Sequence, residues 1–211
     1  MSRLSSAVTR AGLALGSAIG LAALAVVPAT SAHATAPTTP PPPTIAAVLA
    51  PYARSFDTDN NDFNIATHVL LQFPDLAVAA NRAGNSTVFL PTDYAFRALV
   101  RSVTGVTIVP EADLLKAVQR FGIVRLGAIL RYHIVQGARV TYGQLVRTNA
   151  FSLPTMQGST VRVAVSVVPR WTVHLVDRAS RRPDAKVINA DIAASNGVIH
   201  VIDRVMLPFE I

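Results

Sequence analysis

The sequence predicts an α+β domain in which helices come first and strands follow. Between residues 45 and 131, apolar side chains recur every three or four residues, the period of helices with one buried face. From residue 150 onward the period changes to two, as in half-buried strands. The stretch 197–208 is apolar on both faces, which is typical of a strand inside a domain. Segregated helices and strands favour α+β over alternating βαβ units.

The first 34 residues have the parts of a secretory signal peptide. Arg3 and Arg10 give a positive start, residues 11–27 are apolar, and a small-x-small pattern ends at Ala34. The apolar stretch is short and rich in alanine and glycine, so a permanent membrane span is the weaker interpretation. We therefore expect cleavage after Ala34 and a secreted, extracellular chain with no membrane span.

Composition limits how the mature chain is stabilised and what it binds. Cleavage would leave 177 of the 211 residues, which suits one domain with a real core. The chain has no cysteine, so disulfides cannot contribute and packing must hold the fold. Removing two of the 19 basic residues leaves 17 against 12 acidic ones, a charge of +5. That mild, spread charge does not indicate a nucleic-acid partner.

Residues 35–44, "TAPTTPPPPT", form a Pro/Thr tract that precedes the domain. Four successive prolines favour an extended polyproline II segment that packs no core. One interpretation is a stalk, glycosylated on its threonines, that holds the domain off a surface, and the other is a plain disordered leader. We expect the tract to be disordered and the domain to span 45–211.

The elements follow in order along the domain. Helices are predicted over 45–56, broken at Pro51, and over 62–73, ended by Pro74, with Asp62 as the cap of the second. A short strand at 87–90 precedes a helix capped by Thr92. The remaining predicted elements are a helix from Pro110 to Gly122, helical residues 123–131, a strand at 132–135, a helical turn capped by Thr141, and strands around 161–167, 171–175 and 197–208.

The acidic segment "DTDNND", residues 57–62, faintly resembles a calcium-binding loop. Asp62 stands where such a loop needs glycine, and His68 stands where it needs the closing glutamate. The sequence therefore favours a solvated turn over a calcium loop.

Catalytic signatures are missing from the sequence. It contains no Gly-x-Ser-x-Gly elbow, zinc-binding His-Glu-x-x-His helix or phosphate loop, and no thiol nucleophile. Ser195, His133 and Asp191 are conceivable as a triad, but Ser195 lies in a turn before a strand rather than on a strained elbow. A zinc site built from distant histidines is an alternative, but the absence of a metal site is favoured. We expect no enzyme, metal or cofactor.

Arg178, Arg181, Arg182 and Lys186 make the most basic patch of the chain, within the polar loop 177–186. Such a patch fits contact with an anionic wall polymer or glycan, but a solvated loop is the more common case and is favoured here.

Three separated stretches resemble one family. "TVFLPTDYAF" (87–96), "LRYHIVQGARVT" (130–141) and "NADIAASNGVIHVIDRVMLP" (189–208) are similar, in this order, to the first, Tyr-His and last motifs of the fasciclin domain. The resemblance covers roughly residues 62–208. Leu90, where the family more often has a small residue, and the long segment between Val100 and Gly122 depart from the pattern.

The resemblance implies a β-wedge of about seven strands with packed helices, in which the first and last motifs form neighbouring strands. It also implies a secreted or surface module for adhesion or matrix binding, with a cell-surface or matrix protein or glycan as ligand. Tyr132 and His133 of the Tyr-His motif join the basic residues as candidate binding residues. The alternative is a secreted enzyme or small-ligand carrier with a pocket built from distant residues.

The polar residues of the final apolar run have a structural interpretation as well. His200 and Asp203 are an odd number of residues apart, so in a strand they point to opposite faces and cannot form one acid/base pair. We expect His200 to be structural and Asp203 or Arg204 to end the buried stretch. We also expect His133 to be buried, neutral and bonded to a backbone or hydroxyl partner.

Overall fold

The computed structural model describes residues 40–148, 150–168 and 170–211. The predicted signal peptide and residues 35–39 lie outside this part, so the cleavage site stays a prediction. Within the described residues, no helix has both the length and the apolar character needed to cross a bilayer. Residues 40–211 form one compact unit.

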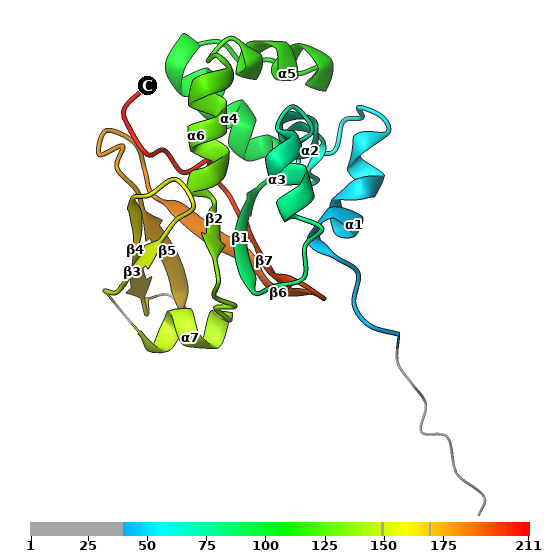
Figure 1. Cartoon of the computed structure of the whole chain (residues 1–211). Helices are drawn as coiled ribbons and strands as arrows, with labels where there is room; N and C mark the ends of the chain where they lie inside the picture. The colour runs from blue at the N-terminus through cyan, green and yellow to red at the C-terminus, as the bar shows by residue number, and fades with distance from the viewer. Residues whose placement is uncertain (1–39, 149, 169) are drawn as a thin grey trace, which may run out of the picture. The chain divides into compact units, whose positions relative to one another are not determined.

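Seven strands and seven α-helices make up the described unit, which confirms the α+β class (Figure 1). The helices are α1 Ile45–Leu49, α2 Asn64–Leu70, α3 Pro74–Ala79, α4 Asp93–Thr104, α5 Glu111–Gln119, α6 Ile123–Tyr132 and α7 Tyr142–Arg147, with a 3₁₀ turn, η1, at Ala50–Ala53. The strands are β1 Ser86–Pro91, β2 Ile134–Gln136, β3 Ser152–Pro154, β4 Thr160–Ser166, β5 Thr172–Val176, β6 Ala185–Ala194 and β7 Gly197–Ile202.

The strands form one sheet in the order β2-β1-β7-β6-β5-β4-β3. The neighbouring pair β1 and β7 is parallel, from Ser86 opposite Gly197 to Pro91 opposite Ile202. The other pairings are antiparallel. The predicted adjacency of the first and last motifs is therefore confirmed.

Two apolar cores lie on opposite faces of β1 and β7. Leu90 and Val201 belong to the core beneath helices α1 to α6. Phe89 and Ile202 belong to the other core, which includes residues of β3, β4 and β5. This position explains the unbroken apolar run of β7, because a strand between two cores must be buried on both faces. Asp203 and Arg204 are only partly buried, but residues 205–208 are buried again, so the expectation that one of these two residues ends the buried stretch is wrong.

Helix starts are partly as predicted. The hydroxyls of Thr92 and Thr141 accept backbone hydrogen bonds and cap α4 and α7. The prediction that Asp62 caps α2 is wrong, because Asp93 Oδ1 instead accepts from the Ile65 backbone N–H at 2.9 Å. Pro74 does follow the second helix, but it also begins α3, where its missing N–H costs nothing.

The end of the Pro/Thr tract contacts the domain. The carbonyl of Pro43 accepts from Ser195 N at 2.9 Å, and the hydroxyl of Thr44 caps α1. Asn196 reinforces this junction, since its side chain accepts from Ile45 N and donates to the carbonyl of Ala80. Order therefore extends to Pro43, two residues before the predicted domain boundary, because these backbone groups find partners. Disorder of 35–39 stays a prediction.

Candidate functional site

His133 lies at the junction of α6, β1 and the C-terminal segment, and its side chain is 3% exposed. Its Nδ1 lies 2.7 Å from the carbonyl of Ile129, and its Nε2 accepts from the Met206 backbone N–H at 3.0 Å. Its own carbonyl accepts from Phe89 N on β1. The expectation that His133 is buried and bonded to backbone is confirmed.

These two bonds fix the tautomer of His133. Since Nε2 accepts, Nδ1 must carry the proton that it donates to Ile129. Burial lowers the pKa of His133 to about 4. The hydrogen bond to Ile129 raises the pKa, but by less than burial lowers it. A neutral ring with both nitrogens occupied has no free position for proton transfer, so His133 is a poor general acid or base.

Replacing His133 by Ala is expected to destabilise the domain by about 3 kcal/mol at pH 7.5, because it opens a cavity and leaves Met206 N and the Ile129 carbonyl without their partner. The folded-state pKa lies below the unfolded value, so wild-type stability from this group is lost as pH falls from about 6.5 towards 4. The difference between wild type and variant should therefore narrow by about 2 kcal/mol at pH 5. Urea unfolding at both pH values measures it.

The control is His174→Ala, since His174 is only partly buried on β5. At pH 7.5 its loss of stability should be smaller than that of His133→Ala. An unchanged gap between wild type and His133→Ala at the two pH values would contradict the assigned protonation state.

Tyr132 and His200 are also built into the structure. Tyr132 is fully buried, its hydroxyl donates to the Thr160 carbonyl, and burial raises its pKa to about 12. His200 Nδ1 accepts from Asp191 N at 3.3 Å, so its Nε2 donates to the Val140 carbonyl at 2.8 Å. Burial lowers the pKa of His200. None of these side chains offers a surface to a large partner.

The imagined triad does not assemble. His133 is committed to Ile129 and Met206, Asp191 Oδ1 accepts from Tyr142 N, and Ser195 donates its backbone N–H to Pro43. No hydrogen bond joins these three side chains among the described residues.

The basic residues divide into two kinds. Arg178, Arg181 and Lys186 are exposed. Arg182 is partly buried and holds the chain end, donating to Ser102 Oγ at 3.1 Å and to the Ile211 carbonyl at 3.0 Å. A carboxylate oxygen of Glu210 lies 3.9 Å from the Arg182 guanidinium, and the other accepts from Arg181 N. The negative charge of Glu210 therefore lowers the net positive charge of the basic patch. A binding role for the three exposed residues stays a prediction, and Arg182 has a structural role.

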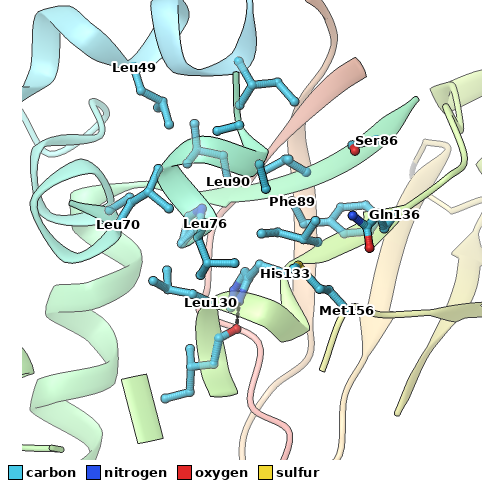
Figure 2. A pocket seen from close by; sticks show the side chains of 18 of the residues that line it. Leu49, Leu70, Leu76, Ser86, Phe89, Leu90, Leu130, His133, Gln136 and Met156 are labelled. Carbon is cyan, nitrogen blue, oxygen red and sulfur yellow. Dashed lines mark hydrogen bonds between the residues drawn. The ribbon is translucent and has the colours of Figure 1, made fainter. Parts of the chain in front are cut away.

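An apolar pocket lies between the helices and β1 (Figure 2). Its empty space is about 800 Å³, including the solvent at its open side. Leucines from α1, α2, α3 and α6 line it together with β1, and the ring of His133 forms part of its wall. Ser86 and Gln136 lie at one side, on β1 and β2, and Gln136 is exposed. The lining is that of a site for an apolar group.

A wider depression adjoins this pocket and shares Ala79, Ser86, Gln136 and Met156 with it. Its other walls include Val78, 56% exposed, and the exposed Arg82. An apolar pocket beside a partly polar rim is the usual anatomy of a protein-binding hot spot. Sequence patterns could not predict this pocket, because at least seven separate segments contribute its walls. In the sequence, each of its apolar side chains has the pattern of an ordinary core residue.

The sequence-family model of the fasciclin domain matches residues 61–208, which are most of the described unit. The chain belongs to the fasciclin domain family. It is 34% identical over 134 residues to Protein sll1483 of Synechocystis sp., covering 64% of this chain and 61% of the relative. It is 31% identical over 140 residues to transforming growth factor-beta-induced protein ig-h3 of Oryctolagus cuniculus, covering 65% of this chain and 16% of the relative.

The fold agrees with a solved fasciclin domain pair from the insect cell adhesion molecule fasciclin I. The match has a TM-score of 0.57 at 18% identity and covers 79% of this chain and 51% of that one. The chain thus spans about half of that solved pair and under two thirds of the Synechocystis relative. The fasciclin resemblance and the β-wedge fold predicted from the three motifs are confirmed.

Proposed function

We propose that this protein is an extracellular, non-enzymatic binding module that recognises a partner at a cell surface or in a matrix. Its fasciclin membership supports the proposal, since fasciclin I is a cell adhesion molecule. In this proposal residues 1–34 direct export and are removed, and the Pro/Thr tract then precedes the domain in the mature chain.

The pocket is the observation that carries the proposal. Its polar lining consists of Ser86, Gln136 and His133, and both nitrogens of His133 are held by backbone. The pocket lining therefore has no carboxylate and no free base that could activate a nucleophile, so it suits binding better than catalysis. The predominantly aliphatic lining also favours a protein ligand over a glycan, because sugars need many polar contacts.

The proposed contact has two parts. An apolar side chain of the partner enters the pocket, and polar groups around it meet the rim formed by Gln136, Asn85 and Arg82. Arg82 is exposed and its guanidinium makes no ion pair with any described residue, so it is available to a carboxylate or carbonyl of the partner. Burying the apolar anchor would supply most of the affinity.

Gln136→Trp is expected to block the pocket, because an indole at this exposed position can cover the opening. Cell-envelope extract is passed over immobilised wild type and variant, and partner proteins are identified by mass spectrometry. The partner should be retained by wild type and reduced at least about tenfold in the variant, which corresponds to about 1.4 kcal/mol.

The matched control is Gln119→Trp, at the exposed end of α5 and away from the pocket lining. It should retain the partner as wild type does. Equal retention by all three proteins would contradict the proposed contact. Recovery of a free apolar small molecule from the purified protein by organic extraction would instead favour the carrier alternative.

A further inference from the structure

Four carboxylates from three segments meet beside the start of α2. Asp57 and Asp62 bracket the loop that leads into α2, Asp93 begins α4, and Glu111 begins α5. One carboxylate oxygen from each of Asp57, Asp62 and Glu111 lies within 4.8 Å of the other two. Asp93 is the neighbour of Asp62 in this cluster. Three of the four are buried, and Asp57 opens the cluster to solvent.

Each of the three buried carboxylates leaves one oxygen without a hydrogen bond. Glu111 Oε2 accepts from Asp57 N at 2.8 Å and from Asn64 Nδ2 at 3.1 Å, and Asp93 Oδ1 accepts from Ile65 N. The buried atoms Asp62 Oδ1, Asp93 Oδ2 and Glu111 Oε1 accept no hydrogen bond from any described residue. Relative exposures of 9%, 0% and 1% for these three residues leave their side chains little access to water.

No basic side chain compensates this charge in the part of the chain that the structure describes. The three ion pairs found there involve other acidic residues. Arg97, on α4, donates instead to Asn60 Oδ1 and to the carbonyls of Ile108 and Val109. Buried carboxylates without a counter-charge are costly, so the cluster calls for either protons or a cation.

We propose that Asp57, Asp62 and Glu111 bind a calcium ion, with Asp93 beside it. The donors are all carboxylate oxygens, which hard divalent cations prefer. Calcium bonds its ligands at about 2.3–2.6 Å, so oxygens up to about 5 Å apart reach one ion. Magnesium demands a tighter octahedron, at about 2.1 Å. The loop 57–62 lacks the glycine and the closing glutamate of a linear calcium motif, and Glu111, far along the chain, supplies the third carboxylate.

The competing state is a shared proton. Burial, together with repulsion among the acids, raises the pKa of Asp62 to about 6 and that of Asp93 to about 8. A proton held between these two carboxyl groups would remove part of the charge without any metal. The two states differ in one measurable way, because only the metal site responds to calcium at constant pH.

The test is calorimetric titration of calcium chloride into the purified, chelator-treated protein at pH 7.5, with melting temperatures recorded in parallel. One ion should bind with a Kd between about 10⁻⁵ and 10⁻³ M, from the weakest calcium sensors to the extracellular calcium modules. The melting temperature should rise by several degrees at 100 times Kd, since only the folded chain brings the three segments together. Magnesium should bind at least about tenfold more weakly.

Asp57→Asn removes one ligand charge at an exposed position, so the fold should survive while calcium affinity falls at least tenfold. Asp59→Asn is the matched control, because Asp59 is an exposed acid of the same loop that caps Asn61 N and is not one of the three ligands. It should bind calcium within about threefold of wild type. The proposal is overturned by an absence of calcium binding in wild type, by equal losses in the two variants, or by magnesium binding as tightly.

Discussion

Replacing Val201 by Asp is expected to destabilise the domain by at least about 4 kcal/mol, enough to unfold many single domains outright. Val201 is 4% exposed and is the last but one residue of β7, opposite Leu90 on β1 and Asn189 on β6. Its side chain belongs to the core beneath the helices, where a carboxylate would lose its hydration without gaining a partner. Circular dichroism and urea unfolding at pH 7.5 measure the effect.

Ile188→Asp is the matched control, because Ile188 lies on the neighbouring strand β6 and is 55% exposed. The same change of chemistry should there cost about 1 kcal/mol or less. If both variants lost stability equally, burial between two cores would not be what makes β7 apolar, and our explanation of the final motif would fail.

Gly197→Ala is expected to cost about 3 kcal/mol, although it adds a single methyl group. Gly197 begins β7 opposite Ser86, and a Cβ there would lie 2.3 Å from the Ser86 carbonyl oxygen and 3.0 Å from Ile45 Cδ1. The first contact is with backbone in the parallel ladder, so it cannot be relieved by rotating a side chain. Relief requires β1 and β7 to separate at the end that also anchors α1.

Gly143→Ala provides the comparison within the same chain. Gly143 lies in α7, its added Cβ would meet nothing within 4 Å, and alanine is the better helix former. This variant should be unchanged or more stable by up to about 1 kcal/mol. Thermal unfolding of both variants separates close packing at β7 from a general intolerance of glycine replacement. Equal melting temperatures for Gly197→Ala and wild type would refute the close approach.

Local patterns in the sequence predicted much of this fold because the elements concerned are regular. The alternation of valines in β4, the two-sided apolar run of β7 and the threonine caps of α4 and α7 depend on neighbours in sequence. Strand β6 was not predicted as a separate element. Its register shifts twice between Val187 and Ile192, and Asp191 has a φ of 58°. Buried and exposed side chains therefore do not alternate regularly along this strand.

Features that depend on distant residues were beyond local reasoning. The cap of α2 comes from Asp93 rather than from the adjacent Asp62, and Glu111 joins the acidic loop from another helix. The pocket has the same origin, since its walls come from separate segments spread between Ile45 and Met156. By contrast, the burial of His133 could be predicted from its place in the Tyr-His motif. A buried polar ring needs hydrogen-bond partners, and His133 finds them in the backbone.

The central claim is that the partner contacts the pocket, and photo-crosslinking tests it most directly. A photoreactive side chain is placed singly at Gln136 beside the pocket, at Gln119 on α5 and at Arg181 in the basic loop, all of them exposed. Each protein is then irradiated with cell envelopes. Our account predicts that one partner protein is captured from position 136 and not from 119 or 181. Capture from position 181 alone would contradict it and place recognition on the basic loop.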